Sequence, residues 1–167
     1  MVYEEYVKTN KVAFLEKVKQ ISAKLGINPD WLMVVMYAES RLNPAAYNNN
    51  GGASGLIQFM PATATWLGTS TAKLRAMSNV EQLDWVYKYY NSLGATNKMK
   101  SVYDLYIVTF FPLALGKADN WIIESKTLSA STIAAANKII DLNKDGKITV
   151  GEFKQYVDMY LKKKTLM

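Results

Sequence analysis

Apolar side chains recur at intervals of three and four residues along most of this chain, and no stretch sustains the two-residue alternation of a β-strand. In residues 10–25 this spacing puts an apolar stripe on one helix face. Gly26 follows, a residue that tolerates the left-handed backbone at a helix C-terminus. The sequence therefore predicts an all-α protein. Further helices are expected over 29–42, 57–67, 71–76, 79–92, 101–116, 119–124, 129–140 and 151–163.

The chain has no histidine and no cysteine in its 167 residues. Their absence excludes disulfides, thiolate nucleophiles, histidine or cysteine zinc sites and every catalytic relay through an imidazole. Acid–base chemistry must then use carboxylates, lysine or tyrosine.

The net charge of +6 comes from 20 Lys and Arg against 14 Asp and Glu. The excess lies in residues 41–100 and in residues 141–167, where Lys162–Lys164 form a basic run. Only Arg41 and Arg75 are arginines, so recognition of nucleic acid bases is not expected. The charge indicates a diffuse attraction to an anionic surface, or simply a solvated lysine-rich face.

The first residues include acids and lack the apolar core of a signal peptide, so we expect no leader. The longest apolar run, 107–115, contains Thr109 and Pro112 and is shorter than a membrane span. We therefore expect no membrane anchor.

The helix expected over 29–42 carries a glutamate in its last turn. The helical period puts Leu32, Val35 and Met36 within about 60° of the direction in which Glu39 points, so Glu39 lies in the apolar stripe. Burial and the partial negative charge of the helix C-terminus both predict a raised pKa, as a general acid near neutral pH requires. A glutamate at the edge of a stripe can also reach water or pair with a lysine, so its position alone does not establish catalysis.

Two sequence blocks that begin at Glu39 carry a family signature. The first reads Glu-Ser-Arg-Leu-Asn-Pro-Ala-Ala over 39–46, and the second reads Gly-Ala-Ser-Gly-Leu-Ile-Gln-Phe-Met-Pro-Ala-Thr-Ala over 52–64. They resemble the E-S-x-x-x-P-x-A and G-A-x-G-L-M-Q-x-M-P-x-T-A patterns of soluble (SLT-type) lytic transglycosylases. Goose-type lysozymes share the fold and the glutamate. The resemblance thus implies a lysozyme-like helical domain, which we expect over 1–125.

The resemblance implies that Glu39 is the catalytic residue. In that family one glutamate protonates the glycosidic oxygen between MurNAc and GlcNAc in peptidoglycan, and the substrate's acetamido group stabilises the oxocarbenium-like centre. The ionised glutamate then removes the proton of the muramic 6-hydroxyl, which closes a 1,6-anhydro ring without a cofactor. Ser54 and Gln58 match positions that hydrogen-bond the sugars, although Gln58 could equally be a buried amide that ties the loop to the core.

The later tyrosine motif of the family, A-Y-N-A-G, is replaced in this chain. Residues 105–117 instead resemble phage-encoded transglycosylase-like lysozymes, whose pattern is L-Y-x-x-x-x-x-P-x-x-x-G-K. The resemblance implies Tyr106 and Phe111 as sugar-facing aromatics, but helical spacing of such residues is also typical of a core.

Residues 141–152 fit the twelve-residue calcium loop of an EF-hand, with oxygen donors at the diagnostic positions and glycine at the sixth. The expected ligands are Asp141, Asn143, Asp145, the carbonyl of Lys147, and Glu152. Calcium sensors pair such loops, whereas this chain has one. We therefore expect Ca²⁺ to be a structural clamp in an extension over 126–167.

Three hypotheses for function remain after these observations. The first is an anhydro-forming transglycosylase, and the second is a hydrolytic muramidase that uses Asp84, Asp104 or Asp119 as a second carboxylate. The third is a calcium-dependent wall-binding or virion structural protein without turnover. Each acts at the bacterial cell wall, in the periplasm or outside the cell, after release at lysis or delivery by a virion. We expect a monomer unless the chain is part of a virion or another assembly.

Overall fold

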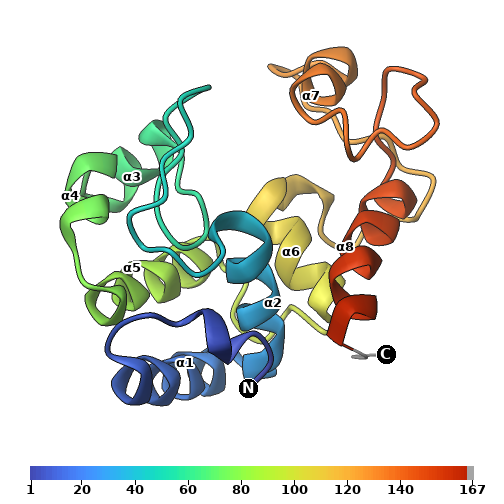
Figure 1. Cartoon of the computed structure of the whole chain (residues 1–167). Helices are drawn as coiled ribbons and strands as arrows, with labels where there is room; N and C mark the ends of the chain where they lie inside the picture. The colour runs from blue at the N-terminus through green and yellow to red at the C-terminus, as the bar shows by residue number, and fades with distance from the viewer. Residues whose placement is uncertain (165–167) are drawn as a thin grey trace. The chain divides into compact units, whose positions relative to one another are not determined.

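The computed structural model describes the backbone of residues 1–164 and the side chains of residues 1–161. The basic side chains of Lys162–Lys164 therefore lie outside the described residues. Within them the chain is helical and has no strand, so the predicted all-α class is confirmed (Figure 1). The helices are α1 (Lys11–Leu25), α2 (Pro29–Ser40), α3 (Pro61–Leu67), α4 (Thr71–Ala76), α5 (Asn79–Ser92), α6 (Val102–Phe110), α7 (Ala130–Ala136) and α8 (Val150–Lys164). None of the described helices is long and apolar enough to cross a membrane.

The chain forms two compact units, residues 1–105 and the residues from Tyr106 onward, and each is described separately. The change of unit falls inside α6 because the rings of Tyr106 and Phe110 pack on Phe153 of α8, with centroids 5.2 and 5.0 Å apart. These units are defined by how compactly the chain folds, whereas the predicted domain boundary at residue 125 follows from the family resemblance and the calcium-loop pattern. The predicted domains, 1–125 and 126–167, stay a prediction.

In the first unit, α2 is the most buried helix. The Asn28 side chain caps it by accepting a hydrogen bond from the Asp30 N–H at 2.9 Å, and Pro29 occupies its first turn. Its five residues 32–36 have no exposed surface. Each such apolar side chain stabilises the fold by roughly 1.5–3 kcal/mol. α1 packs against α2 and α5, and α3 packs against α5.

A loop follows α2 and doubles back on itself before α3. Backbone pairs join Tyr47 to Ser54 and Ser54 to Phe59. The helix expected over 57–67 begins only at Pro61. Proline suits the first turn of a helix, and the residue before it is driven to extended backbone, so the predicted start was four residues too early.

In the second unit, Pro112 interrupts the helix that the sequence predicts over 101–116. α6 ends at Phe110, and a short 3-10 turn covers Pro112–Ala114. Proline lacks the N–H that a continuing helix needs, which explains the break. The helix expected over 129–140 is also shorter, because α7 ends at Ala136.

Residues 119–124, expected to be helical, are not helical. The Ile123 N–H donates to the Ile148 carbonyl at 2.8 Å, and the Val150 N–H donates to the Trp121 carbonyl at 3.0 Å. Ile123 and Ile148 have no exposed surface. This pairing, which we call the 121–150 clasp, joins the segment before α7 to the segment that starts α8.

Candidate functional site

Glu39 lies in the last turn of α2, where the chain leaves the helix. It is half-buried, whereas Val35 and Met36 on the preceding turn have no exposed surface. The helix stops directly after it because Arg41 and Leu42 both adopt left-handed backbone, with φ of 55° and 63°. The carboxylate thus lies at the boundary between the apolar core and the solvent.

Tyr89 of α5 lies close enough to Glu39 to sense its charge. Burial, and in second place the negative charge of Glu39, raise the pKa of the Tyr89 hydroxyl well above its usual range. The Tyr89 ring stands edge-on to Phe59 of the loop, with centroids 6.3 Å apart. Tyr89 is not among the site residues singled out from the sequence. Its shared helix face with the buried Leu83 and Val86 was the available signal.

Ser54 is buried in the loop and its hydroxyl is engaged by the protein. Its Oγ donates to the Gly52 carbonyl at 3.0 Å and accepts a hydrogen bond from Arg75 Nη1 at 2.6 Å. Gln58 is half-buried and left-handed, with φ of 56°, and its Nε2 donates to the Gly55 carbonyl at 3.1 Å. A left-handed non-glycine residue costs about 1–3 kcal/mol, and such strain clusters at functional sites.

Gln82 of α5 connects the loop to its surroundings, and no pattern in the sequence singles it out. This side chain has no exposed surface. Its Oε1 accepts from the Leu56 N–H at 2.6 Å, and its Nε2 donates to the carbonyls of Pro44 and Leu74 at 2.9 and 2.8 Å. On its other side, the Leu56 carbonyl accepts from Ser40 Oγ at 2.8 Å. The Leu56 residue is therefore held between Gln82 and the residue directly after Glu39.

The same contact explains a glycine of the signature. Gly55 has φ of 84°, and a Cβ at this position would collide with Oε1 of Gln82. Only glycine combines this backbone with the close approach of the amide.

Tyr106 and Phe111, the expected sugar-facing aromatics, belong to the second unit. Tyr106 is 2% exposed and contacts the rings of Phe153 and Tyr156 edge-on. Phe111 is half-buried, and its N–H donates to the Ile107 carbonyl at 2.6 Å as the last bond of α6. Tyr106 therefore has the surroundings of a core residue within that unit.

The acidic loop brings its carboxylates together. One oxygen each of Asp141, Asp145 and Glu152 lie within 4.8 Å of one another. Asp141 Oδ2 accepts from the Gly146 N–H at 3.0 Å, and Glu152 Oε2 accepts from the Leu142 N–H at 2.9 Å. Oxygen donors of this kind suit Ca²⁺ or Mg²⁺ rather than a soft metal.

The other two expected ligands lie in the same turn of chain. Asn143 Oδ1 accepts from the Asp145 N–H at 3.2 Å, and the Lys147 N–H donates to Asp145 Oδ1 at 3.1 Å. Glu152 also forms a capping box with Thr149, whose N–H donates to Glu152 Oε1 at 3.1 Å while Oγ1 accepts from the Glu152 N–H at 3.2 Å. The loop thus has a defined shape that includes the start of α8.

A family model described as the transglycosylase SLT domain matches residues 16–107. The match begins within α1, ends within α6, and includes Glu39, the loop and Gln82. No curated protein and no solved structure matches the chain. Since the family model covers more than half of the 167 residues, this chain belongs to the transglycosylase SLT family, whose members are lytic transglycosylases that cleave peptidoglycan.

Proposed function

We propose that this protein cleaves the β-1,4 bond between MurNAc and GlcNAc in peptidoglycan and leaves 1,6-anhydromuramic ends. Glu39 gives its proton to the glycosidic oxygen as the bond from that oxygen to the muramic anomeric carbon breaks. The substrate's acetamido group stabilises the positive centre. The ionised Glu39 then takes the proton of the muramic 6-hydroxyl, whose oxygen bonds to the anomeric carbon, so Glu39 is protonated again and no water is consumed.

The observation that carries this proposal is the half-buried position of Glu39 in the last turn of α2, next to the signature loop and Tyr89. A single carboxylate must change protonation state twice in the proposed cycle. A half-buried site with a fixed surrounding suits this role better than an exposed side chain. The half-buried Gln58, with its left-handed backbone, is proposed to hydrogen-bond the sugar, and Ser54 to shape the loop around it.

The hydrolytic alternative needs a second carboxylate to position water. Asp84 is 69% exposed and pairs with Lys17 at 2.9 Å, and Asp119 is 70% exposed and pairs with Lys154 at 2.7 Å. Asp104 accepts from the Lys100 N–H at 2.8 Å. Each of the three is already engaged in a local contact, which favours anhydro formation over hydrolysis.

We also propose that the loop over 141–152 binds one Ca²⁺ through Asp141, Asn143, Asp145, the Lys147 carbonyl and Glu152. The bound cation would neutralise carboxylates that otherwise repel one another. Its proposed role is to stabilise the start of α8, since Glu152 both closes the loop and caps that helix.

The resemblance of residues 105–117 to phage-encoded enzymes supports delivery to the wall by a virion or at host lysis. Purified virions of a source phage, probed with an antibody to this chain, would test the first route. A chain found only in the lysate would exclude it.

Clearing of purified cell walls by wild-type protein and by Glu39→Gln tests the function. We expect the variant to lose activity by at least about a hundredfold, the usual share of a general acid–base residue. Glu16→Gln, on the exposed face of α1, is the matched control and should clear walls normally. Equal clearing by Glu39→Gln would refute the assignment. Absence of clearing by the wild type would instead favour a binding protein without turnover.

Mass spectrometry of the released glycan decides between the two reactions. Anhydro ends lack the mass of one water relative to reducing ends. Reducing ends as the sole product would establish a muramidase.

A further inference from the structure

Arg75 of α4 is a half-buried cation without an acidic partner. The described residues contain no ion pair that involves Arg75. The chain also has no acidic side chain between Glu39 and Glu81, so the sequence around Arg75 and the loop offers no local carboxylate.

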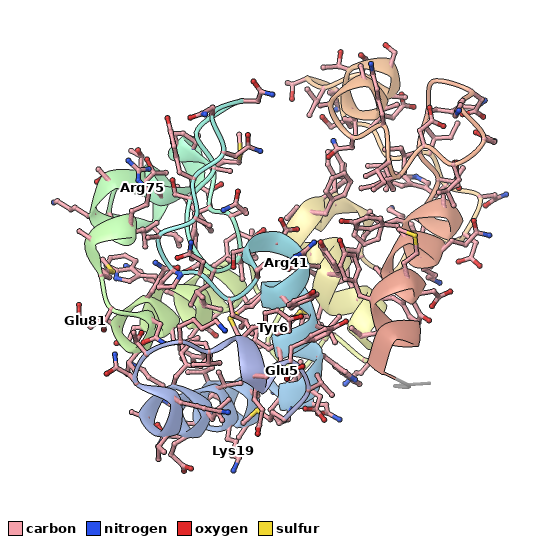
Figure 2. The ribbon with its side chains drawn as sticks, in the orientation of Figure 1. Glu5, Tyr6, Lys19, Arg41, Arg75 and Glu81 are labelled. Carbon is pink, nitrogen blue, oxygen red and sulfur yellow. The ribbon has the colours of Figure 1, made fainter. Side chains whose placement is uncertain are left out.

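Two neutral contacts fix the orientation of the guanidinium. Its Nη1 donates to Ser54 Oγ at 2.6 Å, and its Cζ lies 4.5 Å from the ring centroid of Tyr47. One edge and one face of the planar group are therefore occupied by the loop. Figure 2 shows Arg75 beside α4, next to the loop that carries these partners.

The remaining N–H groups of Arg75 have no protein acceptor in the described part of the chain. A guanidinium has five N–H donors, and only the bond to Ser54 is made. The nitrogens without a partner are accessible, because the one unpartnered side-chain polar atom that is fully buried in the described residues is Ser22 Oγ. A pre-oriented fork of donors that is not fully buried thus remains able to bind an acceptor from outside the chain.

The surroundings of this fork suit a ligand that is partly apolar. Tyr47, whose ring lies against the guanidinium, is 56% exposed. A Cβ on Gly52 would lie 4.0 Å from this ring, in ordinary van der Waals contact. The fork of α4 therefore lies against an exposed aromatic ring of the loop that follows α2.

Arg41, the other arginine, uses its side chain differently. Its Cζ lies 4.6 Å from the Tyr37 ring, and its Nη1 donates to the Tyr37 and Ala38 carbonyls at 2.8 and 3.2 Å. It satisfies carbonyls at the C-terminus of α2. Arg75 also lies in the last turn of its helix, α4, but its side chain donates to Ser54 of the loop instead of to a carbonyl there.

We propose that Arg75 binds a carboxylate of the peptide attached to the muramic acid of the substrate. This inference rests on the proposed function, because it takes the ligand from the same polymer. Planar guanidinium groups bind carboxylates through two parallel hydrogen bonds, and lysine cannot reproduce that geometry. The site selects peptide-bearing glycan over bare glycan.

Calorimetry with the full chain carrying Glu39→Gln tests the site, since that variant holds the ligand without cleaving it. Three probes are compared: a muropeptide with free peptide carboxylates, the same muropeptide with those carboxylates amidated, and a peptide-free glycan of equal length. We expect the free form to bind about tenfold more tightly than the amidated form. The added substitution Arg75→Gln should reduce this ratio to about one, and Arg75→Lys should leave an intermediate ratio.

Because both affinities in the ratio of free to amidated muropeptide are measured on the same variant, a general effect of the substitution on the loop does not change this ratio. Lys73→Gln, an exposed residue of the same helix, removes an equal charge and should keep the tenfold preference. Equal binding of free and amidated muropeptide to the parent, or a preference kept in Arg75→Gln, would overturn the role of Arg75 alone. Failure of all three probes to bind would overturn the proposed substrate class, and this inference with it.

Discussion

Gln82 and Asn79 are buried amides one turn apart on α5 that hold different parts of the first unit. Gln82 holds Leu56 and Pro44 near the signature loop, whereas Asn79 Nδ2 donates to the Thr9 carbonyl at 2.8 Å. Their exposed fractions are 0% and 3%. Substitutions at the two positions can therefore be compared, because both remove a buried amide and only one of these amides holds the signature loop.

We expect Gln82→Ala and Asn79→Ala to lower the free energy of unfolding by similar amounts, about 1–3 kcal/mol, because each leaves buried partners unsatisfied. Only Gln82→Ala should also lower kcat per folded molecule, since Leu56 then loses one of the two contacts that hold the loop beside Ser40 and Glu39. Denaturant unfolding and kcat measured on the same samples check both expectations. Equal kcat values for the two variants would show that Gln82 only stabilises the fold.

Tyr89 should make the protein sensitive to alkali. Because burial and the charge of Glu39 raise the pKa of its hydroxyl, the folded state favours the neutral phenol. The resulting stability is fully present below the ordinary tyrosine pKa of about 10 and is lost as pH rises from there toward the folded pKa. Tyr89→Phe should therefore lose less unfolding free energy between about pH 8 and pH 11 than the wild type.

Thermal unfolding across that pH range checks the expectation. Tyr87→Phe on the same helix is the control, since Tyr87 is less buried. A loss in Tyr89→Phe as large as in the wild type would contradict it. Near neutral pH the Tyr89 hydroxyl is uncharged, so its ionisation should cause neither a rise nor a fall in the pH–activity profile there.

At the residue scale, the sequence predicts the functional residues that belong to contiguous motifs. Glu39, Ser54 and Gln58 were singled out because two contiguous blocks carry the signature. Gln82 and Arg75 were not, because their partners lie 26 and 21 residues away in sequence. Pairing of that kind depends on how α4 and α5 fold back on the loop, which periodicity does not encode.

At the scale of elements, the predicted helices 10–25, 71–76 and 79–92 correspond closely to α1, α4 and α5, which have side-chain or left-handed caps. The predicted helices are wrong where a long-range contact or a proline determines the backbone conformation. Residues 119–124 have helical spacing, yet they pair with 148–150 because Ile123 is buried there against the start of α8. Their backbone bonds go to another segment instead of their own turn.

The loop over 141–152 should make thermal stability depend on calcium. A ligand at a hundred times its Kd stabilises the folded state by about 2.7 kcal/mol, which corresponds to a rise in Tm of roughly 5–10 °C for a chain of this length. Melting curves with calcium and with chelator measure the difference. Glu152→Gln should abolish it.

The matched control for that experiment is Glu124→Gln, an exposed acid of the same unit that lies outside the loop. Its calcium-dependent shift should equal that of the wild type. Identical melting curves of the wild type with calcium and with chelator would remove the proposed clamp.

At the scale of the whole molecule, the net charge of +6 predicts how the proposed wall-clearing activity responds to salt. Cell walls present many carboxylates and phosphates, so part of the encounter is electrostatic. We expect the rate of wall clearing to fall several-fold between low salt and about 0.3 M, where screening shortens the reach of surface charges to less than about 8 Å.

A short peptide-free glycan is the control substrate, because it offers little negative charge. Its cleavage rate should change much less over the same range of salt. Parallel loss of both activities would indicate an effect of salt on the enzyme itself.

The 121–150 clasp closes the segment between its two sides into a loop whose ends lie next to each other. The hydrogen bonds of Ile123 with Ile148 and of Val150 with Trp121 hold the beginning and the end of residues 124–147 together. A segment whose ends already meet can be exchanged for a short turn at little entropic cost. The segment over 124–147 is therefore a site where a different module could be inserted while the ends that lead to α6 and α8 stay joined.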